Sequence, residues 1–97
     1  MRSLTAFMAL VVMAAALPAR AGGQARLMAE TCAACHSPQI HSGIPTLAGR
    51  PAGELLRLLL AFRDGSRAAT VMDRIAKGYS GEELGAIAGE LAGGVGP

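Results

Sequence analysis

The residues best suited to chemistry lie together in one short stretch, AETCAACHSPQ, at residues 29–39. It holds both cysteines of the chain, Cys32 and Cys35, and His36 follows the second cysteine directly. Two thiols three positions apart can each add across a vinyl group of haem, and the adjacent imidazole can then reach the iron. The Cys-x-x-Cys-His motif therefore predicts one covalent haem c, attached through Cys32 and Cys35, with His36 as an axial iron ligand.

The same cysteine pair has two other interpretations. A Cys-x-x-Cys pair can form the redox disulfide of a thiol–disulfide oxidoreductase, but that site sits at the start of a helix that follows a strand. The sequence has no convincing strand, although this enzyme class is kept as the alternative function for Cys32 and Cys35. The other interpretation is half of a zinc site, for which the sequence supplies no second pair of ligands.

A haem iron bound by one histidine takes a second axial ligand, usually a thioether or an imidazole. Met28 lies eight positions before His36 on the same expected helix, so it cannot reach the opposite face of the haem. Met72 lies 36 positions after His36, which is enough chain to come round to that face. The residues alone therefore leave two candidates for the second ligand, Met72 and His41.

Residues 1–21 are expected to form a cleaved signal peptide. An apolar run of about 14 residues follows Arg2, and an Ala-x-Ala cleavage site ends at Ala21. The run is shorter than the ~20 apolar residues that cross a bilayer, and only one arginine precedes it. We therefore expect Sec-type export and a mature chain, residues 22–97, that is a single monohaem domain in the periplasm without a membrane span.

The charge of the chain argues against nucleic acid as a partner. The formal net charge is +2, but Arg2 and Arg20 belong to the expected signal peptide, and the mature part has seven bases against seven acids. Such a neutral domain lacks the basic face that nucleic-acid binding needs. The charges are uneven, since residues 50–77 hold six bases and three acids, whereas residues 78–97 hold three acids and no base. This dipole can orient the docking of a partner.

Helix signals dominate the rest of the sequence. The periodicity predicts helices over 22–35, 51–65, 73–77 and 80–94, and Ser80 and Glu83 have the spacing of a capping box. The first helix is expected to bury one face, formed by Leu27, Met28, Thr31, Cys32 and Cys35. The second helix is apolar around most of its circumference and is expected to be buried on more than one side. The predicted architecture is all-α, with three main helices and long loops that wrap a bound group.

Residues 24–92, nearly the whole expected mature part, resemble the class I c-type cytochromes. The resemblance is close to the haem subunit of flavocytochrome c sulfide dehydrogenases and to related short periplasmic electron-transfer cytochromes. It rests on CAACH (32–36), IPTLAGR (44–50), LLRLLLAFRDGSR (55–67) and ATVMDRIAKGYSGEELGAIA (69–88). The resemblance implies the small class I cytochrome fold around one haem, with Met72 as the distal iron ligand. It also implies that the carbonyl of Pro45 accepts a hydrogen bond from the imidazole of His36.

The resemblance further implies the function of a periplasmic single-electron carrier, which makes no bonds in a substrate itself. As the cytochrome subunit of a sulfide dehydrogenase, the chain would accept electrons from an FAD-containing flavoprotein subunit that docks near Cys32 and Cys35. A free soluble cytochrome that donates to a terminal oxidase or another reductase is the alternative. Leu59 and Phe62 are expected to pack on the haem, and the wider set of haem-packing or core candidates adds Leu55, Leu58, Ile75 and Leu84.

The chain departs from the family at Glu90, where the last helix usually carries an aromatic residue. We therefore expect looser packing of the first helix on the last. Some relatives carry two haems, and this chain has room for one.

Overall fold

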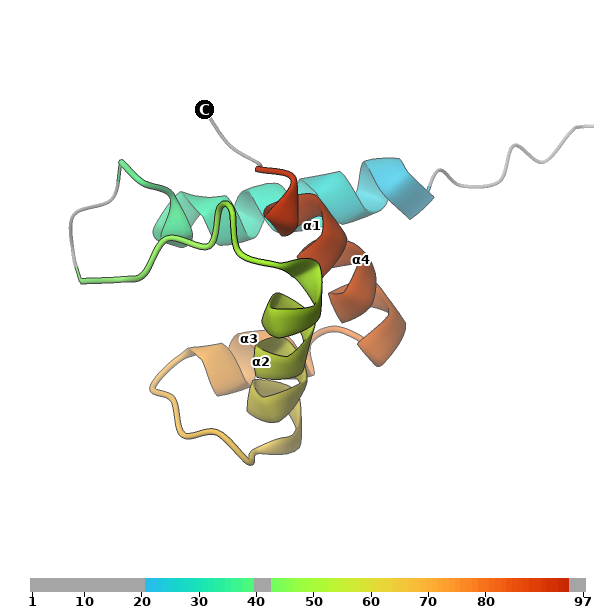
Figure 1. The fold of residues 1–97 in the computed structure, drawn as a ribbon. Helices are drawn as coiled ribbons and strands as arrows, with labels where there is room; N and C mark the ends of the chain where they lie inside the picture. Colours follow the sequence, from blue (N-terminus) through green and yellow to red (C-terminus); the bar gives the residue numbers. More distant parts are fainter. Residues whose placement is uncertain (1–20, 40–42, 95–97) are drawn as a thin grey trace, which may run out of the picture.

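Four α-helices joined by loops make up the part of the chain that the computed structural model describes, residues 21–39 and 43–94 (Figure 1). They are α1 (Ala21–His36), α2 (Ala52–Asp64), α3 (Met72–Lys77) and α4 (Gly81–Ala92). None of the described residues forms a strand, so the prediction of an all-α fold is confirmed. His41 and residues 1–20 of the expected signal peptide lie outside the described residues.

The local sequence signals account for where the helices begin and end. α2 begins directly after Pro51 and ends at Gly65, whose φ of 82° is the left-handed conformation that glycine adopts without strain. α4 begins with the predicted capping box, in which the Glu83 amide donates to Ser80 Oγ and the Ser80 amide to Glu83 Oε1. α3 begins one residue earlier than predicted, at Met72 itself.

The buried face of α1 differs from the predicted one. Leu27 is 65% exposed, and Thr31 and Cys35 are exposed as well. The face that α1 buries is instead a stripe of alanines at i, i+4 and i+8, formed by Ala25, Ala29 and Ala33. α1 packs on α4, and small side chains allow two helix backbones to approach closely, so the larger residues lie beside the contact. The prediction is right for Met28 and Cys32, which are half-buried and pack on the core cluster. It is wrong for the three exposed residues because it followed side-chain size along the helix and overlooked the alanine period.

α4 is the centre of the core because it packs on both α1 and α2. The core cluster combines one alanine of α1 with leucines of α2 and the apolar face of α4: Ala29, Leu55, Leu59, Leu84, Ile87, Ala88 and Leu91. Ala29, Ile87 and Ala88 are almost wholly buried. Glu90, the departure noted in the sequence, is half-buried beside this face.

α2 buries less of its surface than its sequence predicts. Leu55 and Leu59 are buried, Leu58 and Phe62 are half-buried, and Leu60 is exposed. α2 packs against α4 and α3. Because α3 has only six residues, it is too short to cover the rest of the surface of α2. Ile75, a candidate for the core or for haem packing, is 42% exposed on α3.

No helix in the described ranges is long and apolar enough to span a membrane.

The alanine stripe of α1 predicts a strong effect of a single larger side chain. Ala29→Leu should destabilise the folded protein by about 1–3 kcal/mol, because overpacking would force α1 away from α4. Ala34→Leu, on the exposed side of the same helix, is the matched control and should change stability little. Denaturant unfolding of both variants measures the difference, and equal midpoints would contradict this account of the α1–α4 contact.

Candidate haem-attachment site

The two cysteines and the histidine of the motif share the last two turns of α1. Cys32 is half-buried and packs against the core cluster, and its thiol donates to the carbonyl of Met28 at 3.5 Å. Cys35 is exposed, one turn further along. Both thiols are free of a disulfide. The helix therefore presents one sulfur at the edge of the core and one at the surface, next to His36.

The imidazole of His36 is held by the loop that follows α1. Its Nδ1 atom lies 2.6 Å from the carbonyl oxygen of Pro45. A carbonyl oxygen can only accept a hydrogen bond, so Nδ1 carries the proton and donates it. In the neutral ring this leaves the lone pair of Nε2 free, and that is the atom which a metal would require. One hydrogen bond thus fixes both the orientation and the tautomer of the ring.

Hydrogen bonds and packing hold the loop at residues 43–50, which carries the Pro45 carbonyl. The amide of Leu47 donates to the carbonyl of His36 at 3.3 Å, so the loop is tied to the end of α1 a second time. Leu47 packs on the core, and the amide of Arg50 closes a turn onto the carbonyl of Leu47. Gly49 has φ of 81° in this turn, a conformation that favours glycine. The loop is therefore anchored directly after Pro45.

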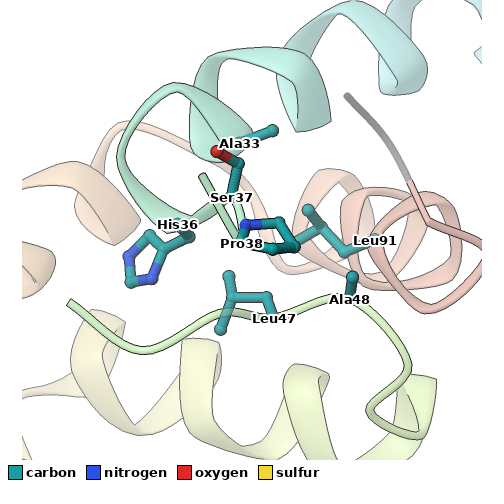
Figure 2. A pocket seen from close by; sticks show the side chains of 7 residues that line it. All are labelled: Ala33, His36, Ser37, Pro38, Leu47, Ala48 and Leu91. Atoms are coloured by element: carbon teal, nitrogen blue, oxygen red, sulfur yellow. The ribbon is translucent and has the colours of Figure 1, made fainter. Parts of the chain in front are cut away.

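A small hollow behind His36 is not a site for a cofactor. Its lining comes from the end of α1, the following loop and α4: Ala33, His36, Ser37, Pro38, Leu47, Ala48 and Leu91. Figure 2 shows that Pro38, Ala48 and Leu91 gather on one side of this hollow, and that the His36 ring points away from them. The hollow is therefore a packing junction between α1, the loop and α4.

Met72 is the first residue of α3, half-buried and packed against the core cluster. In Figure 1 the C-terminal end of α1 and the loop that leads into α3 extend to the same side of α2. That loop is fastened to α2, because the Arg67 amide donates to the carbonyl of Ala61 and the Arg67 guanidinium lies 5.4 Å from the centre of the Phe62 ring. The turn after α3 is fastened as well, since Arg63 Nε donates to the carbonyl of Tyr79 at 2.8 Å.

The electrostatics of the cysteine pair do not favour thiol redox chemistry. Burial raises the pKa of the Cys32 thiol, which disfavours the thiolate that must act as nucleophile. Cys32 also lies in the C-terminal half of α1 and not at a helix N-terminus, where a thiolate would be favoured. Reactive Cys-x-x-Cys pairs have lowered pKa values. The geometry of Cys32 and Cys35 therefore argues against the thiol–disulfide oxidoreductase.

The residues present do fit a covalently attached haem. Two free thiols lie one turn apart, the adjacent imidazole has Nε2 available, and a half-buried thioether is held at the start of α3. Leu58 and Phe62 are half-buried on α2, so apolar side chains remain for a large flat group. Leu59, predicted to pack on the haem, lies in the core cluster. A four-ligand zinc site would need two more protein ligands, and no group of three or more such residues occurs in the described ranges.

Sequence reasoning missed the two arginines that fasten the region of Met72. The hydrogen bond from Arg63 to Tyr79 joins residues 16 positions apart, so no local sequence pattern predicts it. The contact of Arg67 with Phe62 follows from the reversal of the chain at Gly65, which the sequence does indicate.

Two known proteins are similar to this chain. The cytochrome subunit of sulfide dehydrogenase from Chlorobaculum tepidum is 41% identical over 64 residues, which cover 64% of this chain. The thiosulfate dehydrogenase electron acceptor from Stutzerimonas stutzeri is 38% identical over 73 residues, which cover 71% of this chain. The matched parts make up 58% and 34% of these relatives, respectively. No protein-family model matches the chain.

These two relatives and the all-helical fold confirm the resemblance read from the sequence: the chain is similar to the small cytochromes.

Proposed function

We propose that the chain is a single-electron carrier that is exported to the periplasm and holds one covalent haem c. Cys32 and Cys35 would form the thioether links, and His36 and Met72 would be the axial ligands of the iron. When bound, the haem supplies reversible one-electron chemistry at its iron. With both axial positions occupied by side chains, small molecules would be kept from the iron, so a ligand-binding sensor is not proposed.

The observation that carries this proposal is the 2.6 Å contact between His36 Nδ1 and the carbonyl oxygen of Pro45. It supports an axial role for His36 because it directs the proton to Nδ1 and leaves Nε2 to bind a metal. The same bond would strengthen the basicity of the ring as a ligand.

The position of Met72 in the fold supports it as the second axial ligand. Its thioether is half-buried at the start of α3, and the loop before this helix and the turn after it are both held on α2. A ligand held in this way does not have to be ordered when it binds. A methionine opposite a histidine raises the reduction potential of haem iron, which suits a carrier that accepts electrons.

We further propose that the chain serves as the cytochrome subunit of a sulfide dehydrogenase. It would accept electrons from an FAD-containing flavoprotein subunit, and the chemistry on sulfide would belong to that partner. The relative from Chlorobaculum tepidum, which bears that name, supports this assignment. The exposed Cys35 would place one edge of the haem at the surface, and we propose that the flavoprotein docks there.

A second candidate is an electron acceptor in thiosulfate oxidation, which the relative from Stutzerimonas stutzeri supports by its name. A free soluble carrier that donates to a terminal oxidase or another reductase is the alternative to a subunit. Affinity purification from native periplasm separates these cases. A stoichiometric flavoprotein in the eluate supports the sulfide dehydrogenase subunit, whereas its absence at native concentration supports a free carrier.

The attachment of haem is tested by producing the full chain in a host that matures c-type cytochromes. The product should be coloured, and its haem should stay with the protein during extraction with acidified acetone. A colourless product, or a haem that the acetone removes, would overturn the proposed function.

Replacement of the thioether tests the second axial ligand. Met72→Ala should abolish the methionine–iron charge-transfer band and lower the reduction potential, because the ligand that favours ferrous iron is lost. Met28→Ala is the matched control, since Met28 is also half-buried against the core but lies on α1. It should lose stability and keep the band. A wild-type spectrum in Met72→Ala would show that another side chain binds the iron.

Loss of one cysteine tests the two-link attachment. Cys35→Ala should leave a single thioether, which shifts the absorption of the pyridine-treated haem toward that of a haem with one free vinyl group. We expect a loss of stability on the order of 2–5 kcal/mol, comparable to removal of a native cross-link from a small exported domain. Ala34→Ser, an exposed change on the same turn, should alter neither quantity. An unshifted spectrum in Cys35→Ala would refute the link at Cys35.

A further inference from the structure

The peptide group between Tyr79 and Ser80 lies where three helices meet. α3 ends shortly before it, α4 begins directly after it, and α2 reaches it through the side chain of Arg63. The guanidinium donates from Nε to the carbonyl of Tyr79 at 2.8 Å. On the other side of the same peptide group, the amide of Ser80 donates to Glu83 Oε1 at 2.9 Å. Side chains from two different helices therefore bind both polar atoms of one peptide group.

The two side chains carry opposite charges, and each charge matches the atom that it binds. The cation lies at the carbonyl oxygen, the negative end of the peptide dipole, and the carboxylate lies at the N–H, the positive end. Hydrogen bonds in such a chain polarise one another, so each bond strengthens the other. The ion pairs of the described residues involve other side chains, so no carboxylate there competes for the guanidinium. Arg63, the Tyr79–Ser80 peptide group and Glu83 together form the peptide clamp.

The peptide clamp is a contact between parts of the protein and lies away from the side of α2 left for the haem. Leu60 is one turn before Arg63 on the same side of α2, and a Cβ added at Gly81 would lie 3.8 Å from its Cδ2 atom. This side of α2 therefore faces the start of α4. The half-buried Leu58 and Phe62 lie on the opposite side of the helix.

α3 depends on its contacts because it has only six residues and no side-chain cap at its start. A helix this short does not persist in water by itself. Its inner side is held by Met72, which packs on the core cluster, and by Ala76, which is wholly buried. Its end is held by Tyr79, whose amide donates to the carbonyl of Ala76 at 3.3 Å. The peptide clamp fixes Tyr79 in turn, so it anchors the end of the helix that Met72 begins.

We propose that Arg63 and Glu83 are positioning residues that keep Met72 on the haem iron by holding the Tyr79–Ser80 peptide group. The proposal rests on the proposed function, in which Met72 is the second axial ligand. When the peptide clamp opens, the end of α3 is released and the thioether can leave the iron. An added ligand such as imidazole then takes its place, one neutral donor for another, without a change of oxidation state. The peptide clamp therefore sets how readily the electron carrier becomes a ligand-binding haem protein.

The test is the binding of imidazole to the ferric, haem-loaded protein. The apparent affinity is the intrinsic affinity multiplied by the fraction of molecules in which Met72 is off the iron. A fold-change in affinity therefore reports the fold-change in that fraction. Arg63→Met and Glu83→Ala should each raise the affinity about fivefold, as expected for the loss of one hydrogen bond that water can partly replace. Loss of the methionine–iron charge-transfer band follows the titration.

Each variant has a matched control on its own helix. Arg57→Met removes an exposed cation from α2, and Glu82→Ala removes an exposed acid from the first turn of α4. Neither should change the affinity for imidazole. Arg63→Lys keeps a cationic donor and Glu83→Gln keeps an acceptor, so both should remain close to the wild-type affinity. Failure of both conservative variants to restore it would contradict a role through these hydrogen bonds.

A loss of overall stability is separated from the loss of the peptide clamp by a change on α1. Ala25→Leu should lower the midpoint of denaturant unfolding, because it overpacks the buried alanine stripe, and should leave the affinity for imidazole unchanged. A rise in affinity as large as that of Arg63→Met would show that the affinity follows overall stability. That result would refute the positioning role.

The double variant tests whether the two side chains act through one peptide group. Combining Arg63→Met with Glu83→Ala should raise the affinity by less than the product of the two single effects, because the second change acts on a peptide group already released. Single effects that simply multiply would show two independent hydrogen bonds and would overturn the peptide clamp.

Amide hydrogen exchange tests the proposal in the wild-type protein, without any variant. Saturating imidazole holds Met72 off the iron, so the amides of Tyr79 and Ser80 should exchange faster in the imidazole complex than in the free protein. The amide of Ala29, in the middle of α1, should exchange at the same rate in both. Unchanged exchange at Tyr79 and Ser80 would mean that Met72 leaves the iron while the peptide clamp stays closed.

The outcomes separate the two levels of the proposal. A chain without covalent haem, or a haem-loaded chain without the methionine–iron band, would overturn the proposed function and the positioning role together. A haem-loaded chain that shows the band, but whose Arg63→Met and Glu83→Ala variants bind imidazole as the wild type does, would overturn the positioning role alone.

Discussion

The hydrogen bond between His36 and Pro45 is the constraint on which the rest of the site depends. It joins the last turn of α1 to the loop that follows, which a backbone bond from Leu47 to His36 ties to the helix a second time. Because the acceptor is a carbonyl, the bond also decides which nitrogen of the ring is free. The turn at Gly49 and the packing of Leu47 can be understood as the means by which the loop holds that carbonyl in place.

The framework around this site is built from small contacts between helices. Three alanines let α1 lie close to α4, α4 packs in turn on α2, and α2 packs on α3. A domain of this size has little apolar area to bury, and part of α2 stays uncovered by protein. A covalently attached group that filled this side would therefore contribute to the stability of the fold as well as to its chemistry.

Much of this could be predicted from the sequence where the signal is local. The capping box at Ser80 and the stop at Gly65 each depend on a few neighbouring residues, and α4 and α2 follow these signals closely. The buried face of α1 could not be predicted from side-chain size, because close packing of two helices selects alanines over the larger Leu27. The bond from Arg63 to Tyr79 depends on how α2 and the turn after α3 come together, and only the folded structure defines that.

The state of the His36 ring in the haem-loaded protein is the most direct test of the central claim. Nitrogen-15 NMR of the ferrous, diamagnetic protein reports which ring nitrogen carries a proton. The account predicts a slowly exchanging proton on Nδ1, with a nuclear Overhauser contact to residues 44–46, and no proton on Nε2. A proton on Nε2, or an Nδ1 without a proton, would contradict it.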